Sequence, residues 1–239
     1  MIHALIPYYH EDSPAFARSL SMQTGYVEHR FDRRKGRVYW TRAMNELMKE
    51  VPREAVVCIL NNDLELCPDL FEIGARVRPG EVLIPQTREN GKTVEWGLEV
   101  DWSRKKFFYG ERIDVFSPRG IFINARDVLP FRRSLPHYLA DYDWAFRLLK
   151  NGVQPIRMNA WVNHTPNTVN HNLFSPLNPR NPIFWTVFLW FNCPRNLFVE
   201  NLARSWFIFC LHRDCEPLSS CIVRCKKCGK ILEDKWRSE

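Results

Sequence analysis

Polar and acidic residues follow a long apolar run in the first third of the chain. Residues 55–60 are continuously apolar and rich in β-branched side chains, which is typical of a strand covered on both faces, and Asn61, Asn62 and Asp63 come next. Cations such as Mg²⁺ take one or two protein carboxylates and complete their shell with water and phosphate oxygens. Asp63 is therefore a candidate metal ligand. The alternative is a turn in which the three side chains only satisfy backbone geometry.

A histidine follows another predicted strand. Residues 153–162 are expected to form a strand, and His164 comes two residues after it. Imidazole is a common metal ligand, so His164 could face the same edge of a sheet as Asp63. The alternative is a histidine that packs in the core or caps a chain end.

Two aspartates open a helix predicted over residues 141–150, which ends at an Asn-Gly pair. The helix macrodipole favours negative charge near the amino terminus, and an exposed carboxylate there can act as a general base, which makes Asp141 a candidate. Arg147 follows Asp143 by one turn and can hold that carboxylate ionised. The alternative is a charged helix start without a catalytic role.

A basic segment surrounds one aspartate between residues 30 and 37. Guanidinium groups can hold a diphosphate through paired hydrogen bonds, so this segment is a candidate phosphate-binding loop. A solvated loop is the first alternative. A nucleic-acid patch is the second, but aromatic residues are not interleaved with the basic ones as base stacking requires. The segment consists of Arg30, Asp32, Arg33, Arg34, Lys35 and Arg37.

Strand and helix patterns alternate through the first 167 residues. This alternation predicts an α/β fold of the Rossmann type, with a mostly parallel central sheet flanked by helices. Ligands of such sheets bind at the carboxyl ends of the strands, and a β-rich excursion is expected before residue 120. The expected strands are residues 3–7, 26–31, 55–60, 81–85, 120–124 and 153–162, and the expected helices begin at Ser13 and cover residues 38–51 and 141–150.

The chain changes character after residue 167. Residues 1–167 are expected to form the core domain, and residues 168–239 an α-helical, cysteine-rich appendage with two aromatic helical stretches within residues 183–211. These helices could lie on an anionic membrane as a peripheral contact. The alternative is that they cover the sheet or mediate self-association, for example as a homodimer.

Six of the eight cysteines lie after residue 190. Cys225 and Cys228, with the glycine that follows, have the spacing of a zinc knuckle, which supplies half of a tetrahedral Zn²⁺ site. Free thiols or a disulfide are the alternatives. The other two zinc ligands would come from Cys215 and Cys221, from Cys210 and Cys215, or from His212 and Cys215.

Composition narrows the class of protein. Of the 239 residues, 45% are hydrophobic and 26% are charged, and this globular composition excludes collagen-like and wholly disordered chains. The 34 basic and 27 acidic residues give a formal charge of +7. Apolar runs stay below the ~18–20 residues of a membrane-spanning helix. The amino-terminal sequence is too short and wrongly flanked for a signal peptide, so a cytoplasmic protein is expected.

Three segments between residues 2 and 167 occur in a recognisable order. The first is the strand end IPYY at residues 6–9. The second is GRVYWTRAMNEL leading into VVCILNNDLEL, and the third is the acidic helix DYDWAFRLLKNG. Together they resemble the family-two inverting glycosyltransferases of the GT-A fold, in particular rhamnosyltransferase-like members.

The resemblance implies a role for each matching residue. Asp63 would bind Mn²⁺ or Mg²⁺ on the donor diphosphate, His164 would complete the metal shell, and Asp141 would be the catalytic base, supported by Asp143 and Arg147. Ala140 stands where the family usually has a further acid. Trp96 would be a sugar-stacking platform, with a core position as the alternative. The implied nucleotide contacts are Pro7, Tyr8, Tyr9, Asp32, Arg37, Asn45, Asn61 and Asn62, and the implied acceptor contacts are Glu95, Trp96, Arg119 and Gly120.

The leading hypothesis is an inverting glycosyltransferase of polysaccharide biosynthesis. It would move rhamnose or another hexose from a UDP- or dTDP-linked donor to a hydroxyl of a glycan or a lipid-linked acceptor, and nucleic acid is not expected as a partner. The alternative is a catalytically inert GT-A-like binding module whose zinc knuckle contacts nucleic acid or a protein partner. A sugar-nucleotide pyrophosphorylase is disfavoured, because the chain lacks a glycine-rich phosphate loop near its amino terminus.

Overall fold

The computed structural model describes residues 1–34, 40–101, 106–132, 137–164, 215–217, 222–225 and 231–233. The chain divides into two compact units, Met1–Asn181 and Pro182–Glu239. In the described part of the chain, no helix is long and apolar enough to cross a membrane.

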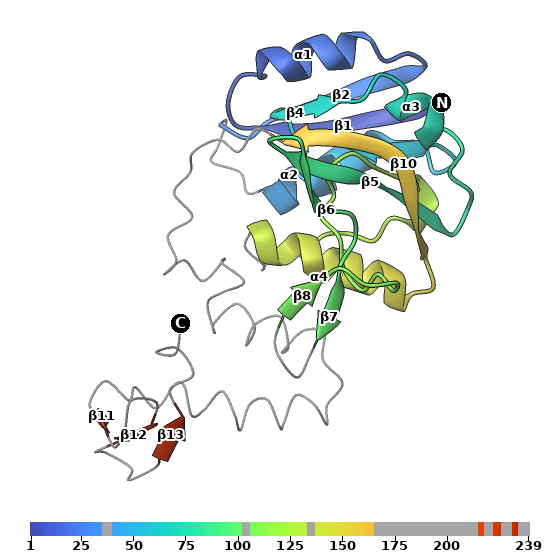
Figure 1. Ribbon diagram of the computed structural model, residues 1–239. Helices are drawn as coiled ribbons and strands as arrows, with labels where there is room; N and C mark the ends of the chain where they lie inside the picture. Colours follow the sequence, from blue (N-terminus) through green and yellow to red (C-terminus); the bar gives the residue numbers. More distant parts are fainter. Residues whose placement is uncertain are drawn as a thin grey trace. The chain divides into compact units, whose positions relative to one another are not determined.

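An eight-stranded sheet forms the centre of the first unit (Figure 1). Its strands are β1 (Ile2–Tyr8), β2 (Tyr26–Asp32), β3 (Val56–Ile59), β4 (Leu64–Leu66), β5 (Glu81–Glu89), β6 (Lys92–Glu95), β9 (Ile121–Asn124) and β10 (Gln154–His164). The order is β2-β1-β3-β9-β5-β10-β4, and β6 pairs with β5. β1, β2, β3, β5 and β10 run in one direction, whereas β9 lies antiparallel between β3 and β5, and β4 is antiparallel to β10.

The sheet is therefore mixed, and the prediction of a mostly parallel sheet is wrong. β5 ends at the carboxyl edge, and no described helix returns the chain to the opposite edge before β9 begins. A parallel partner requires such a crossover, so β9 runs back through the sheet in the antiparallel sense.

Helices pack on both faces of the sheet. α1 (Pro14–Ser21) begins as predicted, because the Ser13 hydroxyl accepts a hydrogen bond from the Phe16 N–H at 3.1 Å. The other helices are α2 (Trp40–Leu47), which continues into a 3₁₀ turn (Met48–Glu50), α3 (Leu70–Gly74) and α4 (His137–Lys150). α4 starts one turn earlier than the sequence predicts, so Asp141 lies in its second turn and not at its amino terminus.

Alternate side chains of each central strand enter two separate apolar layers. Ile6 of β1 belongs to the cluster that contains Phe16 of α1, whereas its neighbour Leu5 belongs to the cluster with Met44 of α2 and Trp144 of α4. This alternation follows from the two-residue period of a strand. α1 and α4 accordingly lie on opposite sides of the sheet in Figure 1, and the sheet is the middle of three layers.

The excursion between β5 and β9 is β-rich, as the sequence predicts. A two-residue turn joins β5 to β6 through Asn90 and Gly91, whose φ angles of 50° and 76° are those that an Asn-Gly hairpin turn requires. β7 (Glu99–Asp101) and β8 (Lys106–Phe108) then pair in a small sheet of their own.

The second unit contains an antiparallel sheet in its described residues. Its strands are β11 (Cys215–Pro217), β12 (Ile222–Cys225) and β13 (Ile231–Glu233), so this part of the predicted α-helical appendage is not helical. The β-branched residues Ile222, Val223 and Ile231 in these strands favour strand over helix. The aromatic stretch at residues 183–211, Cys221 and Cys228 lie outside the described residues.

Candidate active site

Three side chains meet at the carboxyl edge of the central sheet. His164 is the last residue of β10, Glu89 is the last residue of β5, and Asp63 follows β3. Because these strands run in the same direction, their carboxyl ends share one edge. The pair that sequence analysis assigned to one edge, Asp63 and His164, is therefore brought together by the fold.

The His164 imidazole lies between two carboxylates. Its Nε2 is 3.4 Å from Oδ2 of Asp63, and its Nδ1 is 2.9 Å from Oε1 of Glu89, where the geometry is that of a hydrogen bond. Oδ1 of Asp63 is buried and has no hydrogen-bond partner. A buried carboxylate oxygen without a partner is costly, which indicates that a ligand belongs beside it.

The donor set fits a divalent cation that shares its shell with a substrate. Among the residues that the structure describes, no group of three or more His, Cys, Asp or Glu side chains is placed to hold a metal ion without further ligands, and Glu89 contacts the imidazole rather than a common ion site. Mg²⁺ and similar ions bind beside nucleotides with one or two carboxylates and take their remaining ligands from water and phosphate. The partnerless oxygen of Asp63 and the nearby imidazole of His164 fit that pattern.

A second group of charged side chains surrounds Asp141 of α4. Its Oδ1 is buried without a hydrogen-bond partner. Burial raises the pKa of Asp141 well above its usual range, the nearby Arg119 guanidinium opposes that rise, and Glu95 adds to it. Burial likewise raises the pKa of Glu95, which accepts a hydrogen bond from the Ser117 N–H. Asp141 thus has the partly compensated, water-shielded surroundings that are typical of a proton-transfer carboxylate.

Glu95 connects the two groups electrostatically. After burial and Arg119, the influences on its pKa include the negative charge of Glu89, which raises it, and His164, which lowers it. Asp141 responds to Arg119 and to Glu95 in turn. The cation-fitting edge and the candidate base therefore lie within electrostatic range of each other.

Asp143 is placed to stabilise the fold rather than to contact a ligand. It is fully buried, and its carboxylate pairs with Nη1 of Arg132 at 2.6 Å and with Nε of Arg147 at 2.9 Å. Arg147 also donates to the carbonyl oxygen of Pro130 at 3.0 Å. The pair of Asp143 with Arg147 expected from sequence is present, and with Arg132 it fastens the preceding segment to α4.

The predicted nucleotide contacts at the start of the chain lie at the ends of β1 and β2. Tyr8 and Asp32 are paired across these strands. Arg34 holds the Asp32 carboxylate with two side-chain hydrogen bonds of 2.9 and 3.0 Å and lies over the Tyr8 ring at 5.5 Å. Pro7 is buried and Tyr9 is exposed. An aromatic ring and a cation are thus present where a nucleotide base or phosphate was predicted to bind.

Two of the three asparagines predicted to contact the nucleotide, Asn45 and Asn62, make hydrogen bonds to backbone groups of the chain. Nδ2 of Asn62 donates to the carbonyl oxygen of His10 at 2.8 Å, so Asn62 fixes the loop after β1. The Asn45 amide bonds both to the N–H and to the carbonyl oxygen of Phe131, each at 2.8 Å. Asn61 is half-buried just after β3, and Arg37 lies outside the described residues.

The predicted acceptor residues divide into core and edge positions. The Trp96 indole N–H donates to the carbonyl oxygen of Ile84 at 3.0 Å, and its ring packs on the core, which favours the core alternative. Gly120 has φ of 72°, and a Cβ there would lie 2.7 Å from Cγ1 of Val162. Only glycine fits this close approach without strain, and it places the adjacent Arg119 beside the two buried acids.

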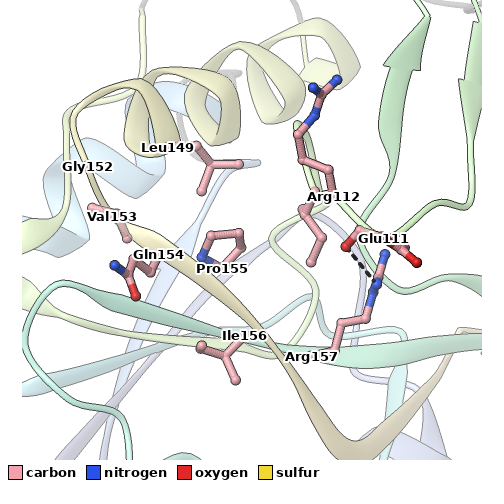
Figure 2. Close-up of a pocket in the computed structure, with 10 residues that line it drawn as sticks. Glu111, Arg112, Leu149, Gly152, Val153, Gln154, Pro155, Ile156 and Arg157 are labelled. Atoms are coloured by element: carbon pink, nitrogen blue, oxygen red, sulfur yellow. Dashed lines mark hydrogen bonds between the residues drawn. The ribbon is translucent and has the colours of Figure 1, made fainter.

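A pocket of about 730 Å³ lies at the other end of β10 (Figure 2). The Arg157 guanidinium at its wall donates to several backbone carbonyls, at 2.9 Å to Trp96 and at 2.7 Å to Gly110. None of the predicted site residues lines it. The lining consists of Glu111, Arg112, Ile113, Leu149, Gly152, Val153, Gln154, Pro155, Ile156 and Arg157.

Two residues of these groups were not predicted from sequence. Glu89 precedes the Asn-Gly turn, and a polar residue at the end of a strand before a hairpin turn is a signal that could have indicated it. No local sequence pattern indicates Arg132, because its partner Asp143 is 11 residues later in the chain, in α4.

Solved structures share this fold, whereas no protein-family model and no curated protein matches the chain. The structure of GalNAc-T7 with UDP, GalNAc and Mn²⁺ is similar with a TM-score of 0.57 at 11% identity, over 80% of this chain and 47% of that one. S. aureus TarS 1-349 is similar with a TM-score of 0.50 at 16% identity, over 69% and 60% of the two chains. The complex of TarS 1-349 with UDP-GlcNAc is similar with a TM-score of 0.53 at 11% identity, over 79% of this chain and 64% of that one. The chain matches from about half to under two thirds of these proteins' length, and it has a GT-A-like fold.

Proposed function

We propose that the chain is a metal-assisted inverting glycosyltransferase. It moves a hexose, with rhamnose as one candidate, from a UDP- or dTDP-linked donor to a hydroxyl of a glycan or lipid-linked acceptor. The observation that supports this most is the meeting of Asp63 and His164 at a sheet edge within electrostatic range of Asp141. The GT-A-like fold agrees with it, and similar structures contain UDP with Mn²⁺ or UDP-GlcNAc.

Each residue has a defined part in this reaction. Asp63 and His164 would hold a divalent cation, which when bound neutralises negative charge on the departing diphosphate. Asp141 takes the proton from the acceptor hydroxyl while that oxygen bonds to the anomeric carbon and the bond from this carbon to the diphosphate breaks. A single displacement needs one carboxylate base and inverts the anomeric carbon. Arg119 opposes the rise in the pKa of Asp141 and so favours its ionised form.

The test is a thermal-shift panel of UDP- and dTDP-sugars on the full chain, with and without Mn²⁺. We expect one donor with Mn²⁺ to raise the melting temperature, and Asp63→Ala to abolish that rise. Asp69→Asn is the control, because Asp69 is an exposed aspartate before α3 whose side chain makes no cap hydrogen bond. An equal rise in Asp63→Ala would contradict the metal role of Asp63. No rise with any donor would favour the inert binding module.

The base is tested separately with the donor so identified. Asp141→Asn should keep the donor-induced rise in melting temperature and lower transfer ~10²–10⁴-fold, the usual contribution of a general base. Turnover near that of the unaltered chain would remove Asp141 from this role.

We also propose a structural Zn²⁺ in the second unit. Cys215 and Cys225 are directly paired in the register of β11 and β12, which brings the knuckle cysteine next to one of its suggested partners. Cys221 and Cys228 would complete the set. Metal analysis of protein purified without added zinc tests this, and less than about a tenth of an equivalent of zinc would reject it.

A further inference from the structure

His164 is fixed by Glu89 rather than by Asp63. The contact between Nδ1 of His164 and Oε1 of Glu89 is 2.9 Å long and has hydrogen-bond geometry, whereas the contact of Nε2 with Asp63 is wider, at 3.4 Å. The side chains of His164 and Glu89 are 13% and 32% exposed, so the hydrogen bond is partly shielded from water. A shielded hydrogen bond to a charged group is among the stronger ones in proteins.

The chemistry of this hydrogen bond determines the direction of the imidazole lone pair. An ionised carboxylate only accepts hydrogen bonds, so Nδ1 of His164 must donate the proton. In the neutral imidazole, the free lone pair is then on Nε2, the nitrogen that faces Asp63. Glu89 therefore selects the tautomer in which the free lone pair of His164 is on Nε2, 3.4 Å from Oδ2 of Asp63.

The backbone holds Glu89 in place for this role. It is the last residue of β5, it pairs with Lys92 across the tight Asn-Gly turn, and the preceding residue pairs with Asn163 of β10. Both residues of the hydrogen bond are therefore on adjacent, paired strands, which fixes the distance between their Cα atoms.

We propose that Glu89 is a positioning residue that orients His164 toward the divalent cation of the active site. This inference rests on the metal role in the proposed function. Partners of this kind, one step removed from the metal, commonly change metal affinity 10–100-fold when they are removed. Glu89 needs no contact with substrate or metal to have this effect.

The test is Mn²⁺ binding to the full chain, measured from the free-ion electron paramagnetic resonance signal, with Asp63→Ala as the baseline. We expect Glu89→Ala to weaken binding about 10–100-fold, and Glu89→Gln, which keeps an acceptor oxygen, to recover most of it. Glu65→Ala is the matched control, because Glu65 lies on neighbouring β4 and bonds to Asn163 at 3.1 Å instead of His164. It should change the affinity less than about twofold.

The tautomer gives a readout that needs no metal. Long-range ¹H–¹⁵N spectra of the metal-free chain should show the His164 proton on Nδ1, and this preference should disappear in Glu89→Ala and persist in Glu65→Ala. Equal Mn²⁺ affinity in Glu89→Ala and the unaltered chain, or a His164 proton on Nε2, would overturn the role of Glu89 alone. No Mn²⁺ binding above the Asp63→Ala baseline, with the proton on Nδ1, would instead overturn the metal role in the proposed function.

Discussion

The two aspartates of α4, buried Asp143 and half-buried Asp141, have opposite surroundings. Asp143 faces two guanidinium groups at hydrogen-bond distance, from Arg132 and Arg147. Asp141 has a buried oxygen with no hydrogen-bond partner and feels Arg119 only at longer range. Two residues along a helix rotate a side chain by about 200°, so the same short motif supplies both environments.

The different surroundings of the two aspartates support different roles for them, Asp143 in stability and Asp141 in proton transfer. A buried carboxylate with two close cations is compensated, and its removal exposes an uncompensated charge. A buried carboxylate without close partners is unfavourable in its ionised form, and this is the usual arrangement of a proton-transfer group. We therefore expect variants on the Asp143 side to change folding and variants on the Asp141 side to change the response to pH.

The largest effect should come from Asp143→Ala. It leaves Arg132 and Arg147 without their common anion in a partly buried place, and the loss of one partner of a buried pair costs about 3–5 kcal/mol of unfolding free energy. Urea unfolding measures it. Glu72→Ala is the control, since Glu72 pairs with Arg76 at the same i,i+4 spacing but both side chains are more than 70% exposed, and it should cost below about 0.5 kcal/mol. Similar costs for the two variants would remove the distinction between the sides.

Asn45→Ala should give the next largest loss of stability. The variant breaks both hydrogen bonds to the backbone of buried Phe131, at about 1–3 kcal/mol in total. Asn151→Ala, which removes one exposed hydrogen bond at the end of α4, should cost less. Donor affinity should not change, because the Asn45 amide is already occupied. A fall in donor affinity without a fall in stability would instead support the nucleotide contact predicted from sequence.

Asn45 also illustrates what sequence can and cannot predict. The apolar run before Asn61, the Ser13 cap and the Asn-Gly end of α4 are local signals, and each predicted its element because neighbouring residues determine it. The partner of Asn45 is 86 residues away in the chain, and no local pattern specifies that pairing. The motif that suggested a nucleotide contact is therefore also compatible with a purely structural one.

The same reason explains the antiparallel β9 and the omission of Glu89. The direction of β9 depends on where the chain is after the β5–β8 excursion, which is a property of the whole topology. The importance of Glu89 depends on the adjacent end of β10, 75 residues later. Asp63 and His164 were predictable as a pair only because the carboxyl ends of parallel strands meet at one edge.

Asp141→Asn should change stability in a pH-dependent way. Burial raises the pKa of Asp141 above its unfolded value of ~3.9, so ionisation of this side chain destabilises the folded state. The contribution of Asp141 to the free energy of unfolding of the unaltered chain is therefore highest at low pH, where Asp141 is protonated, and falls as pH rises toward the folded-state pKa. The neutral amide avoids that loss. We expect the melting temperature of Asp141→Asn relative to the unaltered chain to be higher at pH 8 than at pH 4. Asp143→Asn should lower the melting temperature at pH 8. A difference in melting temperature between Asp141→Asn and the unaltered chain that does not change with pH would contradict the contrast between the two aspartates.

The smallest effect, and the most specific, should come from Arg119→Gln. The Arg119 charge opposes the rise in the pKa of Asp141, so its removal should raise that pKa further and increase the pH-dependent loss of stability at neutral pH. A double-mutant cycle at pH 7 measures this coupling. Asp141→Asn should stabilise the Arg119→Gln chain more than it stabilises the unaltered chain. If the effects of the two substitutions on the free energy of unfolding are additive, Arg119 does not act on Asp141. Of the two acids, the Arg119 guanidinium would then interact only with Glu95.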